Sequence, residues 1–208
     1  MQVQRLLGRI AVVICLGLMA FLSGCVTSPP RQTENICHIF DEKDGWYDDA
    51  KDAKKNWGSP IPVMMAIMHQ ESRFRPKAKP PRSRILWIFP GPRLSSAYGY
   101  SQAKDDTWKW YIKGSHNWGA DRDDFEDAID FVGWYNAQSR KRSGIKQGDA
   151  YHLYLAYHEG HGGFNRRTYK KKAWLKSVAK KVSARSKTYA QQLAGCQDRL
   201  ESSWWWPF

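Results

Sequence analysis

The sequence has few acidic residues, few cysteines and no long apolar run. Of its 208 residues, 20 are Asp or Glu and 33 are Lys or Arg, so the formal net charge is +13. This excess favours polyanionic partners such as nucleic acid, anionic lipid or an acidic cell wall. The most apolar run, from Ile10 to Leu22, is shorter than the roughly 20 residues that a membrane span needs. Its length therefore argues against a membrane-spanning helix.

Tryptophan, in contrast, is abundant. The chain has 11 Trp, and aromatic residues make up 14% of it, which is more than a small core requires. Such a surplus suits either sugar-stacking surfaces or a membrane interface. The length predicts one domain with a substantial core.

Residues 1–24 predict a signal peptide rather than part of the fold. Arg5 and Arg9 form a positive n-region, and the apolar run follows them. The run ends at Leu22-Ser23-Gly24-Cys25, which resembles the lipobox of bacterial lipoproteins. The resemblance implies cleavage before Cys25 and lipidation of that residue.

The residue after Cys25 is Val26 rather than Asp, which in the usual Gram-negative sorting pattern indicates the outer membrane. The sequence thus predicts a lipoprotein of the bacterial cell envelope that faces the periplasm and is attached to the membrane through its N-terminal lipid. Residues 25–35 predict a short tether. Nucleic acid is not expected as a partner, because the basic surface would lie outside the cytoplasm.

Two cysteines, Cys37 and Cys196, remain for the globular part. In an oxidising compartment two such residues usually form a disulfide, the alternative being two unrelated buried thiols. A disulfide between them places the boundaries of the domain at about residues 36 and 199. Residues 200–208 then form an aromatic tail that ends Trp-Trp-Trp-Pro-Phe, suited to a membrane interface or to sugar stacking.

The segment from Ser59 to Pro76 predicts an apolar helix. Ser59 suits the N-cap and Pro60 the first helical position. Apolar residues then recur at helical spacing, Phe74 continues their stripe, and Pro76 ends the segment.

Glu71 is the one carboxylate on that apolar stripe. A carboxyl group held against a core resists ionisation, which suits a general acid that works near neutral pH. The spacing leaves a second reading open, in which Glu71 lies at the rim or pairs with Arg73 or Arg75.

The tetrapeptide Glu71-Ser72-Arg73-Phe74 resembles the Glu-Ser-x-Phe motif of the soluble lytic transglycosylase (SLT) domain, a relative of goose-type lysozyme. The resemblance implies a mainly α, lysozyme-like fold. It also implies that Glu71 is the single catalytic acid and base, and that Ser72 binds substrate.

A second stretch resembles the family motif Gly-Leu-Met-Gln followed by Thr. Gly99, Gln102 and Thr107 match it, whereas Tyr100 and Ser101 replace Leu and Met. Gly allows a tight turn beside the cleft, and Gln offers a donor and acceptors to sugar groups, so both are expected at the substrate site. Taken alone, the stretch also fits the N-terminal turn of a helix that begins near residue 106.

A third stretch, Ala156-Tyr157-His158-Glu159-Gly160, resembles the family motif Ala-Tyr-Asn-Ala-Gly. The resemblance implies that Tyr157 orients Glu71 and that His158 binds sugar in the place of Asn. His158 and His161 are three residues apart, whereas a zinc-protease helix needs four. We therefore expect no metal site and no cofactor.

The remaining segments predict further helices around these motifs. Residues 40–57 predict a short helix. Residues 77–98 predict an irregular loop in which Trp87 lines a sugar cleft or, alternatively, a short hairpin that holds the loop in place. Asp123 or Asp124 suits the cap of a helix to about residue 142. Asp149 caps the next helix. Residues 169–192 predict a basic helix, with an inner face of Trp174, Leu175, Val178, Val182 and Tyr189.

Together these features predict a membrane-anchored lytic transglycosylase that cleaves peptidoglycan glycan strands between N-acetylmuramic acid and N-acetylglucosamine and leaves 1,6-anhydro ends. The alternatives are a catalytically silent peptidoglycan-binding lipoprotein and a lysozyme-type hydrolase.

Overall fold

The computed structural model describes residues 28–85 and 89–202. The predicted signal peptide, Cys25, Trp87 and the end of the aromatic tail lie outside the described residues. The described part is mainly helical, as predicted, and its elements are α2 (Ile36–Glu42), α3 (Trp46–Trp57), α4 (Ile61–Ser72), β1 (Arg82–Ile85), β2 (Phe89–Arg93), α5 (Asp105–Ser115), α6 (Phe125–Ser143), α7 (Ala150–Asn165), the 3₁₀ helix η2 (Thr168–Lys171), α8 (Ala173–Ala194) and α9 (Gln197–Ser202).

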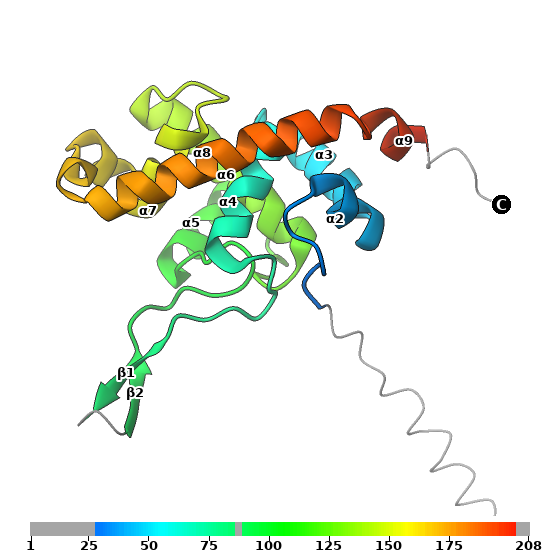
Figure 1. Ribbon diagram of the computed structural model, residues 1–208. Coiled ribbons are helices and arrows are strands. Elements are labelled where there is room, and N and C mark those ends of the chain that lie inside the picture. Colours follow the sequence, from blue (N-terminus) through cyan, green and yellow to red (C-terminus); the bar gives the residue numbers. More distant parts are fainter. Residues whose placement is uncertain (1–27, 86–88, 203–208) are drawn as a thin grey trace, which may run out of the picture.

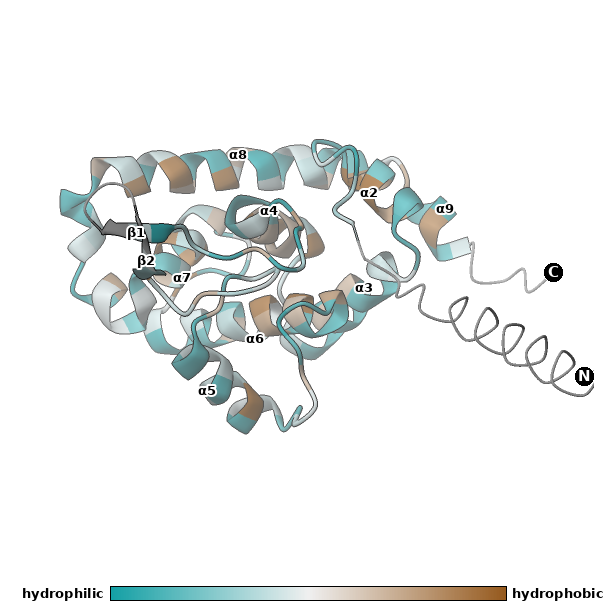
Figure 2. Ribbon diagram, turned by 90° about the horizontal axis from the view of Figure 1, so that it is seen from below, coloured by the Kyte–Doolittle hydropathy of each residue, from teal (hydrophilic) through white to brown (hydrophobic). Residues whose placement is uncertain are grey.

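Helix α4 lies at the centre of the helical body. It packs against α8 on one side and α6 on another, and α8 runs across both α4 and α7 (Figure 1). Of the 12 residues of α4, nine are buried. The hydropathy colouring shows hydrophilic and hydrophobic residues alternating along α8, one of the helices that surround α4 (Figure 2). A helix that is apolar on nearly all sides is stable only inside such a shell.

The ends of α4 differ from the prediction. The helix begins at Ile61 with Pro60 as its N-cap, because the Ser59 hydroxyl is used elsewhere: it accepts a hydrogen bond of 2.9 Å from the Asn136 amide. The helix ends at Ser72, and Phe74 takes a left-handed φ of 58°. Phe74 is therefore not part of the helical stripe, although it is fully buried.

The N-termini of α6 and α7 lie where the sequence predicts them. The Asp124 carboxylate accepts a hydrogen bond from the Asp127 amide, and Asp149 does the same for His152. Helix α7 continues past its glycines, with a kink at Gly160, whose φ is 70° and ψ 159°.

The predicted basic helix is divided into η2 and α8. Leu175, Val182 and Tyr189 form its buried face, as predicted. The prediction was wrong for Trp174, which is 56% exposed. Trp174 precedes Leu175 directly and so points away from the face that Leu175 buries.

Of the two predictions for residues 77–98, the hairpin is the correct one. Strands β1 and β2 are antiparallel, with Arg82 opposite Arg93 and Ile85 opposite Phe89. The hairpin projects from the helical body (Figure 1).

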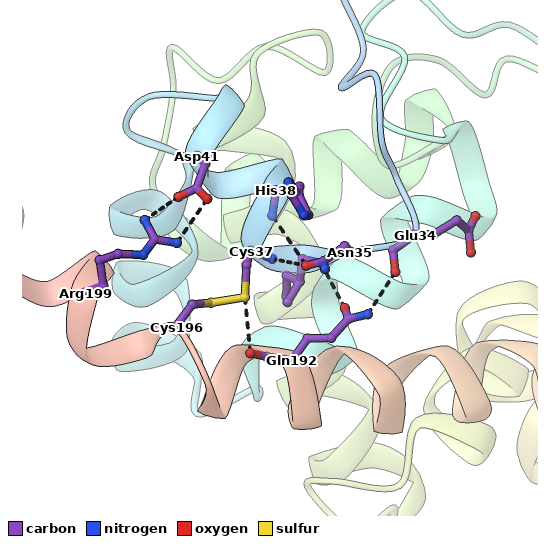
Figure 3. The surroundings of a disulfide bond; sticks show 9 residues. Glu34, Asn35, Cys37, His38, Asp41, Gln192, Cys196 and Arg199 are labelled. Carbon is purple, nitrogen blue, oxygen red and sulfur yellow. Dashed lines mark hydrogen bonds and ion pairs between the residues drawn. A yellow bond between two sulfur atoms is a disulfide. The ribbon is translucent and has the colours of Figure 1, made fainter.

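A disulfide joins Cys37 of α2 to Cys196 just after α8, which confirms the predicted pair (Figure 3). Beside it, Arg199 donates two hydrogen bonds, of 2.6 and 3.0 Å, to the Asp41 carboxylate. The side chain of Gln192 accepts a hydrogen bond from the Ile36 amide. The two ends of the domain are thus joined by a covalent bond, an ion pair and backbone contacts.

The described end of the expected tether lies on α8. Pro30 is buried, Glu34 pairs with Arg185 at 2.6 Å, and the Tyr189 hydroxyl donates to the Thr33 carbonyl. None of the helices among the described residues is long and apolar enough to cross a membrane.

Candidate active site

A cavity of about 370 Å³ opens where α4, α5, α6 and α7 meet. It brings together the three motifs that the sequence separates, and its lining residues are Glu71, Ala97, Gln102, Ala103, Lys104, Thr107, Phe131, Tyr135, Tyr157, His158, Glu159 and Gly160. Four of the predicted site residues line the cavity, and Ser72 and Gly99 do not.

Glu71 lies in the last turn of α4 and reaches the cavity from its apolar wall. Burial raises the pKa of its carboxyl group to about 7, and a hydrogen bond from Tyr154 partly opposes that rise. The residue is partly exposed where it lines the cavity, and among the described residues it forms no ion pair with Arg73 or Arg75, one of the alternatives that its spacing left open. At neutral pH a large share of Glu71 is therefore protonated and can donate a proton.

The contact with Glu71 comes from Tyr154 rather than from Tyr157. The hydroxyl of Tyr157 instead donates a hydrogen bond of 2.6 Å to the Ser101 carbonyl, so its orientation is fixed by the second motif. Tyr154 is 4% exposed and faces the Glu71 carboxyl group. Sequence reasoning missed Tyr154, although it stands three residues before Tyr157 and so on the same face of α7.

Gly99 and Gln102 build the loop at the edge of the cavity. A Cβ atom on Gly99 would lie 1.9 Å from the Arg122 carbonyl oxygen, and its φ is 76°, so only glycine fits there. The Gln102 amide nitrogen donates to the carbonyl oxygens of Ala78 and Gly99, both at 2.9 Å. Gln102 thus holds the loop while it lines the cavity, and Gly99 shapes the loop from behind.

The structure does not bring Ser72 to the cavity. The residue is 1% exposed, and its hydroxyl donates to the Met68 carbonyl at 3.3 Å, one turn back along α4. The hydroxyl of Ser72 is bonded within its own helix and does not line the cavity, so the structure lends no support to its contact with substrate, which stays a prediction.

Glu159, the second carboxylate of the cavity, is bound by its neighbours. Its side chain is 4% exposed and pairs with Lys172 at 2.7 Å. Burial alone would raise its pKa, but hydrogen bonds from Lys172, Thr168 and His158 outweigh burial and lower it. Glu159 therefore stays ionised, in contrast to Glu71.

The two histidines near the kink of α7 make different contacts. His158 lines the cavity, and its ring lies 5.1 Å from that of Trp174. His161 turns the other way, with Nε2 2.9 Å from the Ser139 hydroxyl and its ring stacked on Tyr135. Among the described residues, no group of His, Cys, Asp and Glu side chains is arranged to hold a metal ion.

Comparison with known families identifies a matching family model. The family model described as "Transglycosylase SLT domain" matches residues 13–196, which is most of the chain and includes all three motifs. No curated protein matches the sequence.

Proposed function

The chain belongs to the transglycosylase SLT domain family, and from this we propose that it is a lytic transglycosylase that cleaves the bond between N-acetylmuramic acid and N-acetylglucosamine in peptidoglycan. The family points to peptidoglycan as substrate. The bond cleaved, the product and the residues that act are our proposal, and the pair of unlike carboxyl groups in the cavity supports it.

In the proposed reaction Glu71 acts twice. Its protonated carboxyl group first gives its proton to the glycosidic oxygen, and the bond from C1 to that oxygen breaks. The N-acetyl oxygen of the substrate stabilises the positive charge at C1. The 6-hydroxyl of the same sugar then attacks C1, and the Glu71 carboxylate takes the hydroxyl proton, which regenerates the acid. No water is consumed, and the new end carries a 1,6-anhydro ring.

The proposal rests on the different protonation states of the two cavity carboxyl groups, Glu71 and Glu159. Most glycosidases use one carboxylic acid and a second, free carboxylate that acts as nucleophile or activates water. Here burial raises the pKa of Glu71 to about 7, whereas Glu159 is held by Lys172 and Thr168. A carboxylate whose oxygens accept these bonds is a poor nucleophile or base. In the proposed reaction the 6-hydroxyl of the substrate attacks C1 in place of such a nucleophile or an activated water.

The test is to digest purified cell walls with the wild-type protein and with two matched variants. Glu71→Gln keeps the shape of the side chain but has no proton to give, so turnover should fall by at least the roughly 10²–10⁴-fold assigned to acid–base catalysis while wall binding remains. Glu159→Gln should cost far less. The released ends should lack a reducing sugar.

Two other results would indicate the alternatives. Reducing-end products, or equal losses in Glu71→Gln and Glu159→Gln, would indicate a hydrolase with two working carboxylates. Wall binding without any soluble product from the wild-type protein would indicate a catalytically silent peptidoglycan-binding protein.

We also propose that the protein is an outer-membrane lipoprotein that faces the periplasm. The lipobox at Leu22–Cys25 supports this, and it lies outside the described residues. Cys25→Ala should move the protein from the membrane fraction to the soluble periplasmic fraction. Unchanged fractionation would contradict lipid attachment at Cys25.

A further inference from the structure

We propose that Trp174, supported by His158, forms an outer sugar-binding surface that extends the cavity along the glycan strand. This inference rests on the proposed function, because it takes a glycan as the ligand. It assigns a role to a side chain that sequence periodicity places in the core and that the structure places at the surface.

Trp174 has no part in the packing of α8. Its ring is 56% exposed, while the next residue, Leu175, is completely buried. Among the described residues, the other large apolar side chains with comparable exposure are Leu94 and Trp118, which lie on other segments. Among the described residues, α8 carries no other large apolar side chain of comparable exposure beside Trp174, whereas a surface that binds a protein or a membrane is a continuous apolar patch.

The ring of Trp174 is nevertheless held in place. It lies 5.1 Å from the ring of His158, at 79°, an edge-to-face contact. Two residues before Trp174, Lys172 pairs with Glu159 at 2.7 Å, which fixes the start of α8 against the kinked turn of α7. An aromatic side chain with this support loses little conformational freedom when a ligand binds.

The same contacts place Trp174 next to the catalytic cavity. His158 and Glu159 both line the cavity together with Glu71, and they are the residues that Trp174 and Lys172 contact. An aromatic surface thus continues from the cavity wall, through the imidazole of His158, to the exposed indole of Trp174.

The size of the cavity explains why such a surface is needed. At about 370 Å³ it lies at the lower end of the range for pockets that enclose a small molecule. A glycan strand is a polymer, so most of it must lie outside the cavity. The weakly polar C–H faces of a pyranose ring pack well on an indole, whose polar edge tolerates nearby water and hydroxyl groups.

Binding of defined oligomers to the Glu71→Gln protein tests this inference without turnover. Calorimetric titration with N-acetylglucosamine oligomers of two and of six units separates the cavity from the outer surface. Trp174→Ala in the Glu71→Gln background should weaken binding of the six-unit oligomer by roughly three- to tenfold, the size of one aromatic contact, and leave the two-unit oligomer unaffected. Trp174→Phe should restore most of the loss.

Trp118→Ala is the matched control, because Trp118 is 72% exposed and does not line the cavity. It should leave the binding of both oligomers unchanged. Equal effects of the two Trp variants, or equal losses for both oligomers in Trp174→Ala, would overturn the inference. So would a loss of binding to anionic phospholipid vesicles in Trp174→Ala with no loss for the six-unit oligomer.

These outcomes are separate from a failure of the proposed function. Reducing-end wall products would overturn the transglycosylase mechanism and leave the outer surface in place. Oligomer binding that does not depend on Trp174 would overturn the outer surface alone. No oligomer binding at all by the Glu71→Gln protein would overturn the outer surface, while anhydro products from the wild-type protein would still support the mechanism.

Discussion

Replacing Glu71 by Gln should stabilise the protein at alkaline pH and leave its stability at acid pH nearly unchanged. The ordinary pKa of the carboxyl group is 4.5, and burial raises it to about 7 in the folded protein. Between these values the folded state keeps a proton that the unfolded state has released. The free energy of unfolding therefore falls as the pH rises through this window.

The size of the effect follows from the pKa difference of about 2.5 pH units, at about 1.4 kcal/mol for each unit. Ionised Glu71 thus costs the wild-type protein up to about 3 kcal/mol above pH 7. Gln resembles the neutral acid and carries no such cost. For a chain of this length, the melting temperature of Glu71→Gln should be higher by roughly 6–12 °C at alkaline pH.

Urea unfolding of the wild type and of Glu71→Gln at about pH 4 and about pH 8 measures this difference. The other titrating groups are the same in both proteins and cancel. Glu159→Gln is a control of opposite sign: hydrogen bonds and its ion pair lower the pKa of Glu159, so its ionised form stabilises the fold, and the variant should lose stability at pH 8. A stability gain in Glu71→Gln that is the same at both pH values would refute the reasoning, because a neutral cause would then explain it.

Three further predictions concern the support of the cavity. Tyr154→Phe removes the hydrogen bond that stabilises ionised Glu71, so the alkaline limb of the pH–activity profile should move to higher pH. Tyr157→Phe is the control, because it loses only a hydrogen bond to a backbone carbonyl. Its alkaline limb should stay in place. In urea titrations, Gly99→Ala should lower the free energy of unfolding by more than Gly45→Ala does, because both residues have positive φ but, of the two, only Gly99 would place an added Cβ against a carbonyl oxygen. The Gly45 change should cost about 1–2 kcal/mol. Equal costs would contradict the steric argument. Replacing both bridged cysteines by serine should cost up to about 5 kcal/mol of stability, and an unchanged melting temperature would show that the disulfide adds no stability.

The apolar helix could be predicted from spacing alone, whereas for its carboxylate the spacing left burial and a place at the rim both open. Met64, Ile67 and Met68 are completely buried, and the raised pKa of Glu71 follows from its place on their stripe. The caps of α6 and α7 were also predictable, because Asp124 and Asp149 bond to amides within three residues. Such contacts are local, and local sequence determines them.

The residues that the sequence misplaced have long-range partners. Ser59 was expected to cap α4, but Asn136, 77 residues later, supplies its hydrogen bond. Tyr154 belongs to no motif, and only the folded arrangement, in which α4 and α7 both pack on α6 and α8, shows that it reaches Glu71. A choice between local and distant hydrogen bonds depends on tertiary structure, which spacing does not contain.

Trp174 shows a limit of periodicity itself. Five apolar residues of the basic segment were assigned to one face, but Trp174 and Leu175 are adjacent and point about 100° apart on a helix. Only one of them can face the core fully. The smaller residue does so, and the larger one is left beside the cavity.

The bond between Cys37 and Cys196 also changes what a single backbone cut does to the molecule. These residues are 159 positions apart, so nearly the whole described domain lies within one covalent ring. The β1–β2 hairpin projects from the helical body and is an accessible place for an endopeptidase. A cut there opens the ring but releases no fragment. α4 with Glu71 and α7 with Tyr154 stay in one molecule until a reductant separates them. In any compartment that contains proteases and lacks reductants, a nicked copy can therefore keep its cavity intact.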